Sequence, residues 1–570
     1  MASTSQVSSV EEEKISAIEQ TQERPRYTDR EKLLTMLGVL MVMLLASLDQ
    51  TIVDTAMPRI ITDLRGINYY TWVTTAYLLT STVMVPIYGK LSDIFGRKPI
   101  FLIGVVLFLA GSAACGASQN MAQLVAFRAF QGIGAAALMP IAIAVIGDLF
   151  TARERGRWQG LTGGIFGLSS VLGPTAGGWI TDNSTWRWVF YVNLPIGAIA
   201  LLVLIFLMPT LHSKDSRRPS IDYLGAALLI AGTVPFLLAF TWAGSTYPWL
   251  SWQIMSLFAG ALVVLTTFVF YEHNLERHDG QPIIDPSLFT NRIFTTSVLI
   301  SMITSMGMFG CIVFLPLYSQ GVLGISATNS GLRLIPLMGG IIVSSIVSGI
   351  LVSRFGKYKL IAIAGMVIAI GGSLLLQQLT ADSTPNQLIV AMLVLGLGLG
   401  CSFSLYTIIV QNALPTKLGQ ATSGLTFFRQ IGGTIAVAAM GSVMNSTYSP
   451  AFQNAIPAAV KKVLPGKTLD LFNDPNVLLS DEVQKQFQKQ LAAYGPQGKA
   501  LYGQLMEAVK VGLTGGIHNV FVLSSLLMVL AFIISLFLKE IPLIGNKRKA
   551  AEHEAPEDAA STSVSAISIH

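Results

Sequence analysis

The chain has 570 residues, of which 52% are hydrophobic and 12% are charged, and its mean hydropathy is +0.60. This composition excludes a soluble globular protein and indicates a protein of the lipid bilayer. The net charge of +6 reflects an uneven distribution of Lys and Arg over the loops, so it does not indicate nucleic-acid binding. The three cysteines, Cys115, Cys311 and Cys401, lie in apolar segments, and we expect no disulfide framework.

Apolar stretches of about 20 residues, each long enough to cross roughly 30 Å of hydrocarbon as a helix, recur along the chain. We count fourteen of them. They lie near residues 33–57, 70–90, 99–118, 121–146, 158–182, 187–208, 222–243, 250–271, 293–318, 328–353, 358–379, 386–410, 421–444 and 515–538. The expected fold class is therefore an all-α polytopic membrane protein.

The charges in the short loops predict the orientation of the chain. Residues 1–32 are polar and lack the apolar core of a secretory signal, so we expect a cytoplasmic tail. Loops rich in Lys and Arg stay in the cytoplasm. With the amino terminus inside, the external short loops hold only Arg59, Arg65 and Arg187. An even number of spans then returns the tail at 539–570 to the cytoplasm.

The chain contains an internal repeat. Residues 89–98 return, without a gap and 260 positions later, as residues 349–358, and both segments are short basic turns between apolar spans. The first turn follows span 2 and the second follows span 10, whereas a plain duplication of six helices would separate them by six spans. Spans 7 and 8 must therefore be an extra pair between two six-helix bundles.

This repeat predicts the domain organisation. After the tail, an N-terminal six-helix bundle occupies 33–208, and a linker with spans 7 and 8 occupies 209–292. The C-terminal bundle has spans 9 to 13 at 293–444 and span 14 at 515–538. An external loop, 445–514, lies between spans 13 and 14. Its segment 481–487 looks like an amphipathic helix that is too polar to span the membrane.

Two opposite charges lie at similar depth in the first bundle. Asp49 is about six residues from the outer end of span 1, and Arg128 about seven residues from that of span 4. An ionised carboxylate in hydrocarbon costs about 3 kcal/mol or more, so such a residue is a functional candidate. Desolvation disfavours its ionised form and a nearby cation favours it, and a balance between the two permits proton loading and release. The alternative is a fixed structural ion pair.

Two further charges are harder to assign. Asp54 is rotated about 140° around the helix from Asp49, so the two carboxylates cannot both point into one cavity. Asp54 could attract cationic substrates at the outer mouth, or it could be hydrated and silent. Arg429 is the one deeply placed charge of the second half, where no Asp or Glu lies at depth. It could reach a carboxylate of the first bundle, or bond Gln430, carbonyl groups and water.

The turn after span 2 and a motif in span 5 have physical interpretations of their own. Asp93 could meet the positive amino-terminal end of a helix in the opposite bundle, such as span 11, an attraction of about 0.3–1 kcal/mol. The plainer alternative is a solvated loop; its repeat carries Ser353 instead. In span 5, Gly173, Gly177 and Gly178 allow close helix approach, and Pro174 deletes a backbone hydrogen bond and can kink the helix.

Several of these motifs resemble the major facilitator superfamily. The turn 89–99 is similar to its signature loop, and residues 48–58 are similar to the first-helix motif of its fourteen-span drug/proton antiporters. Three further matches are Arg128, Gln131, Gly132, Gly134 and Ala136 with an Arg-x-x-Gln-Gly-x-Gly motif, Gly173, Pro174, Gly177 and Gly178 with the antiporter motif, and 428–433 with the fourteen-span family. The resemblance implies the major facilitator fold, with two six-helix bundles and two inserted helices.

The resemblance also implies a function, which is proton-coupled antiport that exports lipophilic, often cationic drugs or toxic compounds by alternating access. Asp49 and Arg128 would couple transport to protons. Candidates for substrate binding or coupling are Asp54, Gln131, Arg429 and Gln430. The latch, closed in the outward-open state and broken in the inward-open state, would comprise Gly89, Asp93, Gly96 and Arg97.

We expect a transporter of the plasma membrane with both termini in the cytoplasm, and not an enzyme. Its partners would be a lipophilic small molecule, protons and the bilayer, without nucleic acid. The chain has no Walker-type loop and no metal-spaced His or Cys pairs, so we expect no cofactor beyond the proton gradient. Two alternatives are export of a lipid or other amphiphile and, from a different class, a membrane sensor that does not transport.

Overall fold

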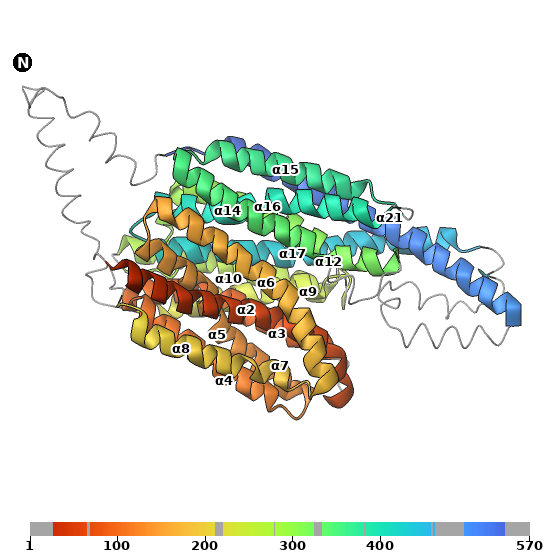
Figure 1. The fold of residues 1–570 in the computed structure, drawn as a ribbon, viewed down its shortest axis with the longest axis horizontal. Coiled ribbons are helices and arrows are strands. Elements are labelled where there is room, and N and C mark those ends of the chain that lie inside the picture. The colour runs from red at the N-terminus through yellow and green to blue at the C-terminus, as the bar shows by residue number, and fades with distance from the viewer. Residues whose placement is uncertain are drawn as a thin grey trace, which may run out of the picture.

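The structure is a computed structural model. It describes residues 27–64, 69–210, 220–244, 246–278, 280–323, 333–380, 383–457, 460–461 and 495–541. These residues are almost entirely helical, with a single isolated β-bridge among them, between Ala243 and Tyr247. The long helices run side by side in one elongated bundle (Figure 1).

The helices of the first half are α2 (Asp29–Leu64), α3 (Tyr70–Phe95), α4 (Arg97–Gly116), α5 (Met121–Leu149), α6 (Ala152–Asn183), α7 (Trp188–Tyr191) and α8 (Asn193–Leu207). An additional pair follows, α9 (Tyr223–Trp242) and α10 (Trp252–Arg277), with the short α11 (Ser287–Thr290). The second half has α12 (Arg292–Gly321), α14 (Ile335–Phe355), α15 (Lys359–Gln377), α16 (Pro385–Ala413), α17 (Leu418–Ala455) and α21 (Gly495–Leu536).

The fold class is confirmed, since eleven helices of the described chain are long and apolar enough to cross a membrane. Helices α3, α6 and α17 are long but are not among these eleven, so the count of fourteen spans stays a prediction. All three carry many small and polar residues and pack chiefly against other helices. Helix α3 packs on α5 and α17, α6 on α2 and α14, and α17 on α12 and α21.

The two halves meet through equivalent helices. Helix α3 contacts α17, and α14 contacts α6, so each contact joins the second long helix of one half to the fifth of the other. Helices α9 and α10 pack on each other, and α9 also contacts α3 and α17. The inserted pair therefore lies beside one of the two junctions between the halves.

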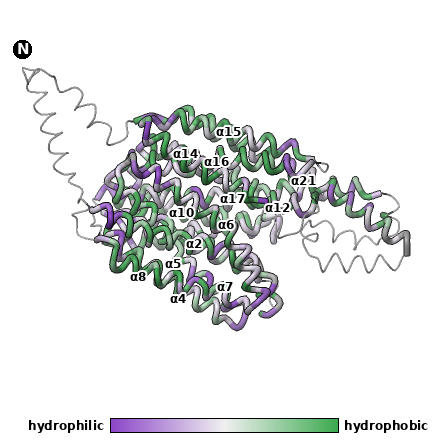
Figure 2. The backbone as a smooth tube through the Cα atoms, in the orientation of Figure 1, coloured by the Kyte–Doolittle hydropathy of each residue, from purple (hydrophilic) through white to green (hydrophobic). Residues whose placement is uncertain are grey.

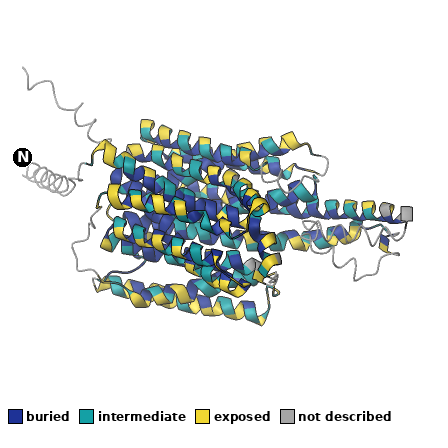
Figure 3. Cartoon of the chain, turned by 60° about the horizontal axis from the view of Figure 1, so that its bottom comes forward, coloured by how far each residue is buried: buried dark blue, intermediate teal, exposed yellow. Residues whose placement is uncertain are grey.

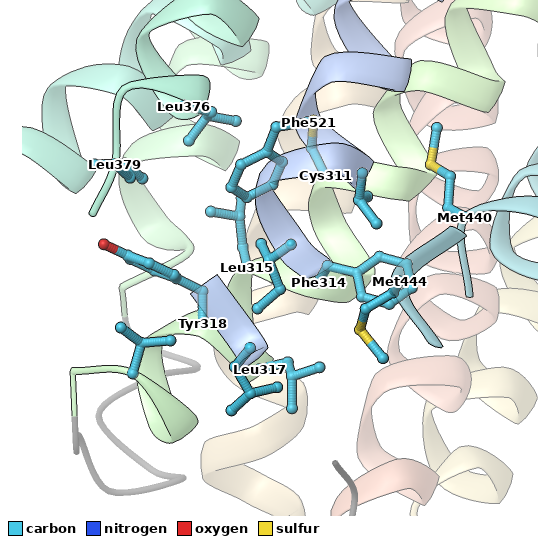
Figure 4. Packing of buried hydrophobic residues seen from close by; sticks show 14 of the residues in the cluster. Cys311, Phe314, Leu315, Leu317, Tyr318, Leu376, Leu379, Met440, Met444 and Phe521 are labelled. Carbon is cyan, nitrogen blue, oxygen red and sulfur yellow. The ribbon is translucent and has the colours of Figure 1, made fainter. Parts of the chain in front are cut away.

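Apolar side chains fill the spaces between helices and also cover the outside. In the second half, Cys311, Phe314, Met440 and Phe521 belong to a buried cluster shared by α12, α17 and α21 (Figure 4). Buried residues lie inside the bundle and exposed ones along its outer helices (Figure 3), and apolar residues occur on both (Figure 2). Exposed apolar side chains such as Phe206 are expected where the surroundings are lipid.

The helices around the predicted external loop are longer than the sequence indicates. Helix α17 continues to Ala455 and α21 already begins at Gly495, so both enter the region 445–514. The extension is packed, because the rings of Tyr448 and Phe452 stack at 5.7 Å and join the buried cluster of α21. The amphipathic segment 481–487 lies outside the described residues, and the predicted domain boundaries stay predictions.

The repeated turns share one backbone feature. Gly96 has φ +90° between α3 and α4, and Gly356 has φ +69° after α14. Glycine adopts positive φ at no steric cost, unlike residues with a Cβ atom. The two turns therefore share a glycine at positive φ but not one backbone conformation, because ψ is 158° at Gly96 and 2° at Gly356.

Candidate functional site

The carboxylate of Asp49 lies inside the first bundle with no exposed surface. Its Oδ2 atom accepts a hydrogen bond from Arg128 Nη1 at 2.8 Å, which joins α2 to α5. Arg128 is only 2% exposed. Ion pairs this deeply buried are satisfied only when further hydrogen bonds complete them, so the surrounding polar groups matter.

Two amides complete the site. Gln131 Nε2 donates to Asp49 Oδ1 at 2.9 Å, and Asn193 Nδ2 from the start of α8 donates to the same oxygen at 2.8 Å. Asn193 is fully buried and also donates to Ser112 Oγ, which in turn donates to the carbonyl oxygen of Phe190. The carboxylate therefore receives three donors from α5 and α8.

The sequence interpretation missed Asn193 and Ser112. The available signal was a single Asn in the otherwise apolar span 187–208. A polar amide inside hydrocarbon needs a partner, so its isolation already indicated a contact. The partner's identity depends on the packing of α8 against α2 and α4, which spacing along the chain does not give.

Arg128 keeps several contacts besides Asp49. Its Nη1 also donates to Gln131 Oε1 at 2.9 Å, and its Nε donates to the carbonyl oxygen of Val73 at 3.5 Å. The guanidinium carbon lies 4.1 Å from the centre of the Tyr77 ring, a cation–π contact. The arginine would thus remain partly compensated if the carboxyl group became neutral.

Asp54 lies on a different face of α2 from Asp49. Its side chain is exposed, and it makes no hydrogen bond with another described residue. The structure therefore separates the two carboxylates by environment, one enclosed among donors and one open.

Two glycines of the span 5 motif face α2. A Cβ atom added at Gly173 would collide with Thr51, and one at Gly177 would collide with Thr55 and the carbonyl oxygen of Ile52. A Cβ at Gly178 would meet nothing within 4 Å. The chain remains helical through Pro174 from Ala152 to Asn183. The motif thus brings α6 close to the helix that carries Asp49, through two of its three glycines.

Asp93 caps a helix of the opposite half. Its carboxylate accepts hydrogen bonds from the backbone N–H groups of Gly419, at 3.1 Å, and Gln420, at 2.8 Å, in the first turn of α17. Arg97, which is 6% exposed, pairs with Asp93 at 2.6 Å and with Asp148 at 2.8 Å. A Cβ at Gly419 would collide with both Asp93 and Arg97, so glycine permits this approach.

Asp93 thus meets the amino-terminal end of a helix in the opposite half, as expected, but this helix is not span 11, the example that the sequence suggested. Span 11 corresponds to α15, and the backbone N–H of Tyr358 before it donates to Glu540 of the same half at 3.1 Å. The start of α17 has no side-chain cap of its own after Lys417, and it packs against α3. Asp93 therefore meets predicted span 13.

Gly89, another residue of the predicted latch, packs at the same junction between α3 and α17. A Cβ at Gly89 would collide with Ser423 of α17, and in the repeat a Cβ at Gly349 would collide with the backbone of Gly156 in α6. The start of α6 has a capping box of its own, in which Glu154 accepts from Thr151 N and Thr151 accepts from Glu154 N. The starts of α6 and α17, which are equivalent in the two halves, are thus capped in two different ways.

A second contact closes the start of α17. Lys417 Nζ pairs with Asp285, in the segment after α10, and donates to Ser287 Oγ at 2.9 Å. Burial raises the pKa of Asp285, but the shared proton with Glu276 and the hydrogen bonds from Lys417 and Ser287 outweigh it, and the pKa lies below its usual value. The linker of the inserted pair therefore binds the same helix end as Asp93.

In the second half, Arg429 has no carboxylate partner among the described residues. Its guanidinium carbon lies 4.6 Å from the centre of the Phe403 ring. The Oε1 atom of the neighbouring Gln430 is buried without a hydrogen bond. Arg429 and Gln430 therefore do not join the Asp49 site. Within the described chain, no cluster of three or more His, Cys, Asp or Glu could hold a metal ion.

A family model described as "Major Facilitator Superfamily" matches residues 39–437. The chain belongs to the Major Facilitator Superfamily. The resemblance of its motifs to that superfamily is thereby confirmed, and the superfamily is one of transporters that need no cofactor.

Several curated members of the Major Facilitator Superfamily are similar over most of their length. The multidrug transporter protein MdtP of Bacillus subtilis is 39% identical over 536 residues, covering 92% of this chain and 96% of the relative. Multidrug resistance protein 3 of the same organism is 37% identical and covers 88% and 94%. The efflux pump FUS6 of Gibberella fujikuroi is 33% identical and covers 76% and 78%.

One solved structure of the Major Facilitator Superfamily supports the fold. The human organic anion transporter MFSD10 (TETRAN) has a TM-score of 0.58 and 14% identity, over 89% of this chain and 100% of that one. At this identity the likeness concerns the arrangement of helices alone.

Proposed function

We propose that the protein is a proton-coupled antiporter that exports lipophilic, often cationic compounds by alternating access. Its relatives, a multidrug transporter, a multidrug resistance protein and an efflux pump, support export of small molecules. The buried ion pair of Asp49 and Arg128, completed by Gln131 and Asn193, is the observation that carries the proton coupling.

A proton that binds Asp49 removes one of two opposite charges from the bundle. The attraction between α2 and α5 then weakens, because the pair contributes only while both groups are ionised. Arg128 retains Gln131, Val73 and Tyr77, so the neutral state avoids an uncompensated guanidinium. Such a site can exist in two protonation states without unfolding its surroundings, which coupling requires.

The contacts of Asp93 and Lys417 at the start of α17 support alternating access. They join the two halves at the end of the bundle that carries the basic turns, which we place in the cytoplasm. In this conformation that end is closed. Opening it toward the cytoplasm requires these polar contacts to break, while proton uptake at Asp49 from outside would accompany substrate release.

The positive charges of the loops indicate the location and orientation of the chain. We place the protein in the plasma membrane with fourteen spans and both termini in the cytoplasm, because Lys and Arg concentrate in the loops at the Asp93 end. The three helices that are less apolar, α3, α6 and α17, would span while shielded by their neighbours.

Transport by purified protein in proteoliposomes tests the coupling. With an imposed pH gradient and ethidium as the lipophilic cation, wild type should accumulate ethidium and Asp49→Asn should fall to the level of empty liposomes. Counterflow of ethidium, which requires no net proton movement, should persist in Asp49→Asn. Persistence would show that the variant still folds and binds.

Asp182→Asn is the matched control, because Asp182 is an exposed carboxylate near the end of α6. It loses the same charge and should transport as wild type does. Full gradient-driven transport by Asp49→Asn would contradict the proposal.

A further inference from the structure

The second half contains a positive charge, that of Arg429, for which the described residues supply no acceptor. Arg429 makes neither a hydrogen bond nor an ion pair with any described residue, and its one aromatic contact is with Phe403. A guanidinium group carries five N–H donors and no acceptor. A ring face compensates part of the charge but leaves these donors unpaired.

A small cavity adjoins this arginine. Its lining consists of Ser301, Thr304 and Ser305 from α12, Ser402 and Phe403 from α16, and Arg429 from α17. The cavity has room for about one water molecule. It lies where three helices of the second half meet, and Arg429 itself keeps partial exposure.

The hydroxyl groups that line the cavity are unpaired as well. The Oγ atoms of Ser301, Ser305 and Ser402 are buried and have no hydrogen-bond partner. Ser301 and Ser305 are four residues apart and thus lie on one face of α12. Buried polar groups without partners cost about 1–3 kcal/mol each. Their gathering around one cavity indicates a ligand that accepts hydrogen bonds.

The first half arranges its buried donors around an acceptor. There the donors of Arg128, Gln131 and Asn193 converge on Asp49, an acceptor that the protein provides. Around Arg429 similar donors converge, but the acceptor is missing from the described chain. A group with negative charge would satisfy the guanidinium and the hydroxyls together.

We propose that Arg429, Ser301, Ser305 and Ser402 form a binding site for a monovalent anionic group. One oxygen of a carboxylate matches the cavity in size and charge, and a chloride ion shares the chemistry but is larger than water. If the ligand is the carboxylate of an exported compound, the proposal rests on the proposed export function. The exported substrates would then include organic acids and zwitterions. As chloride, the ligand is independent of that function.

Thermal unfolding of the purified full-length protein in detergent tests the site. The probes are benzoate, its neutral analogue benzamide, and chloride, each added at constant ionic strength in sulfate buffer. Benzoate or chloride should raise the midpoint of wild type, because a ligand that binds only the folded state stabilises it. Benzamide should not. A response to chloride alone assigns the site to the inorganic ion, and a response to benzoate assigns it to a carboxylate.

Variants decide whether Arg429 is responsible. Arg429→Gln should weaken the apparent affinity for the anion by about tenfold or more, since a charged hydrogen bond is lost. Ser305→Ala keeps the charge and should weaken it about threefold to tenfold, which gives a second readout if Arg429→Gln does not fold. Arg354→Gln removes an exposed arginine of α14 and should respond as wild type does.

Three results would overturn the site: wild type responds to neither anion, benzamide stabilises as well as benzoate, or Arg429→Gln and Ser305→Ala both respond as wild type. None of these depends on proton coupling, because the measurement uses no gradient. A failure of gradient-driven transport in wild type would instead count against the export function while leaving anion binding intact.

Discussion

The carboxylate of Asp93 accepts the backbone N–H of Gln420 at 2.8 Å, so the first turn of α17 is capped by a residue from the other half of the chain. The first turn of a helix leaves backbone N–H groups unpaired and carries partial positive charge. Lys417, at the position of the cap, supplies no side-chain acceptor. The contact between the halves is therefore also the contact that completes a helix.

Removal of this cap should loosen the start of α17. In Asp93→Ala, loss of a cap worth about 0.5–2 kcal/mol should speed amide exchange at Gly419 and Gln420 by about twofold to thirtyfold. Hydrogen–deuterium exchange of the peptide that begins α17, followed by mass spectrometry, measures this directly. Ser353→Ala, at the equivalent repeat position, should leave that peptide unchanged. Equal exchange rates in Asp93→Ala and wild type would show that Asp93 does not cap α17.

Adjacent glycines of the span 5 motif should differ sharply in tolerance. Gly177→Ala places a methyl group against Thr55 and the backbone of Ile52, and such overpacking costs about 1–3 kcal/mol. Gly178→Ala meets nothing within 4 Å and should be neutral or slightly stabilising, because alanine favours helices. The two variants are compared by the amount of folded protein in membranes and by the midpoint of thermal unfolding. Equal behaviour of the two variants would show that α6 and α2 do not approach here.

Asn193 should matter for the Asp49 site although it lies outside every motif. Asn193→Leu removes one donor from the buried carboxylate and leaves Ser112 without its amide partner. We expect a loss of about 1–3 kcal/mol in stability, measured by thermal unfolding in detergent. Asn183→Leu, at the exposed end of α6, is the control and should change little. A neutral Asn193→Leu would mean that the amide contributes nothing to the site.

The contact between Asp285 and Lys417 should depend on pH in a defined direction. Because the pKa of Asp285 is lowered in the folded protein, its contribution is fully present above about pH 4, the usual value, and is lost as pH falls through the lowered pKa. The stability difference between wild type and Asp285→Asn should thus be present at pH 7 and shrink in strong acid, and the neighbouring Glu276, whose pKa is raised, titrates between these limits. Thermal scans across this range measure it. A difference that already disappears near pH 6 would exclude the ionised contact.

Depth matching along helices predicted which charges of the first half would meet. Asp49 and Arg128 were assigned to similar depths from the ends of their spans, and the structure pairs them at 2.8 Å. This works because a helix rises by a fixed distance per residue and the membrane gives a common reference. The same argument cannot choose partners by lateral position, which is why Asn193 was missed.

The particular helix of the opposite half that Asp93 caps was mispredicted for a similar reason. Any helix start in the opposite half offers unpaired N–H groups, and the sequence does not show that Glu540 already serves the start of α15. One usable signal was present. Ahead of predicted span 5 the chain carries Thr151 and Glu154, the pattern of a capping box, whereas Lys417 lies ahead of span 13. An uncapped start indicates that a cap comes from elsewhere.

Because α6 caps its own first turn with Thr151 and Glu154, separation of α6 from α14 leaves no amide of that turn newly unpaired. Separation of α3 from α17 uncovers the amides that Asp93 holds. The two junctions thus differ by about 0.5–2 kcal/mol from capping alone. Spin-label distances across each junction, measured as the pH is changed, would reveal unequal opening. Capping thus makes separation of α3 from α17 the costlier step, so a chain built from two similar halves carries an asymmetry in the cost of opening.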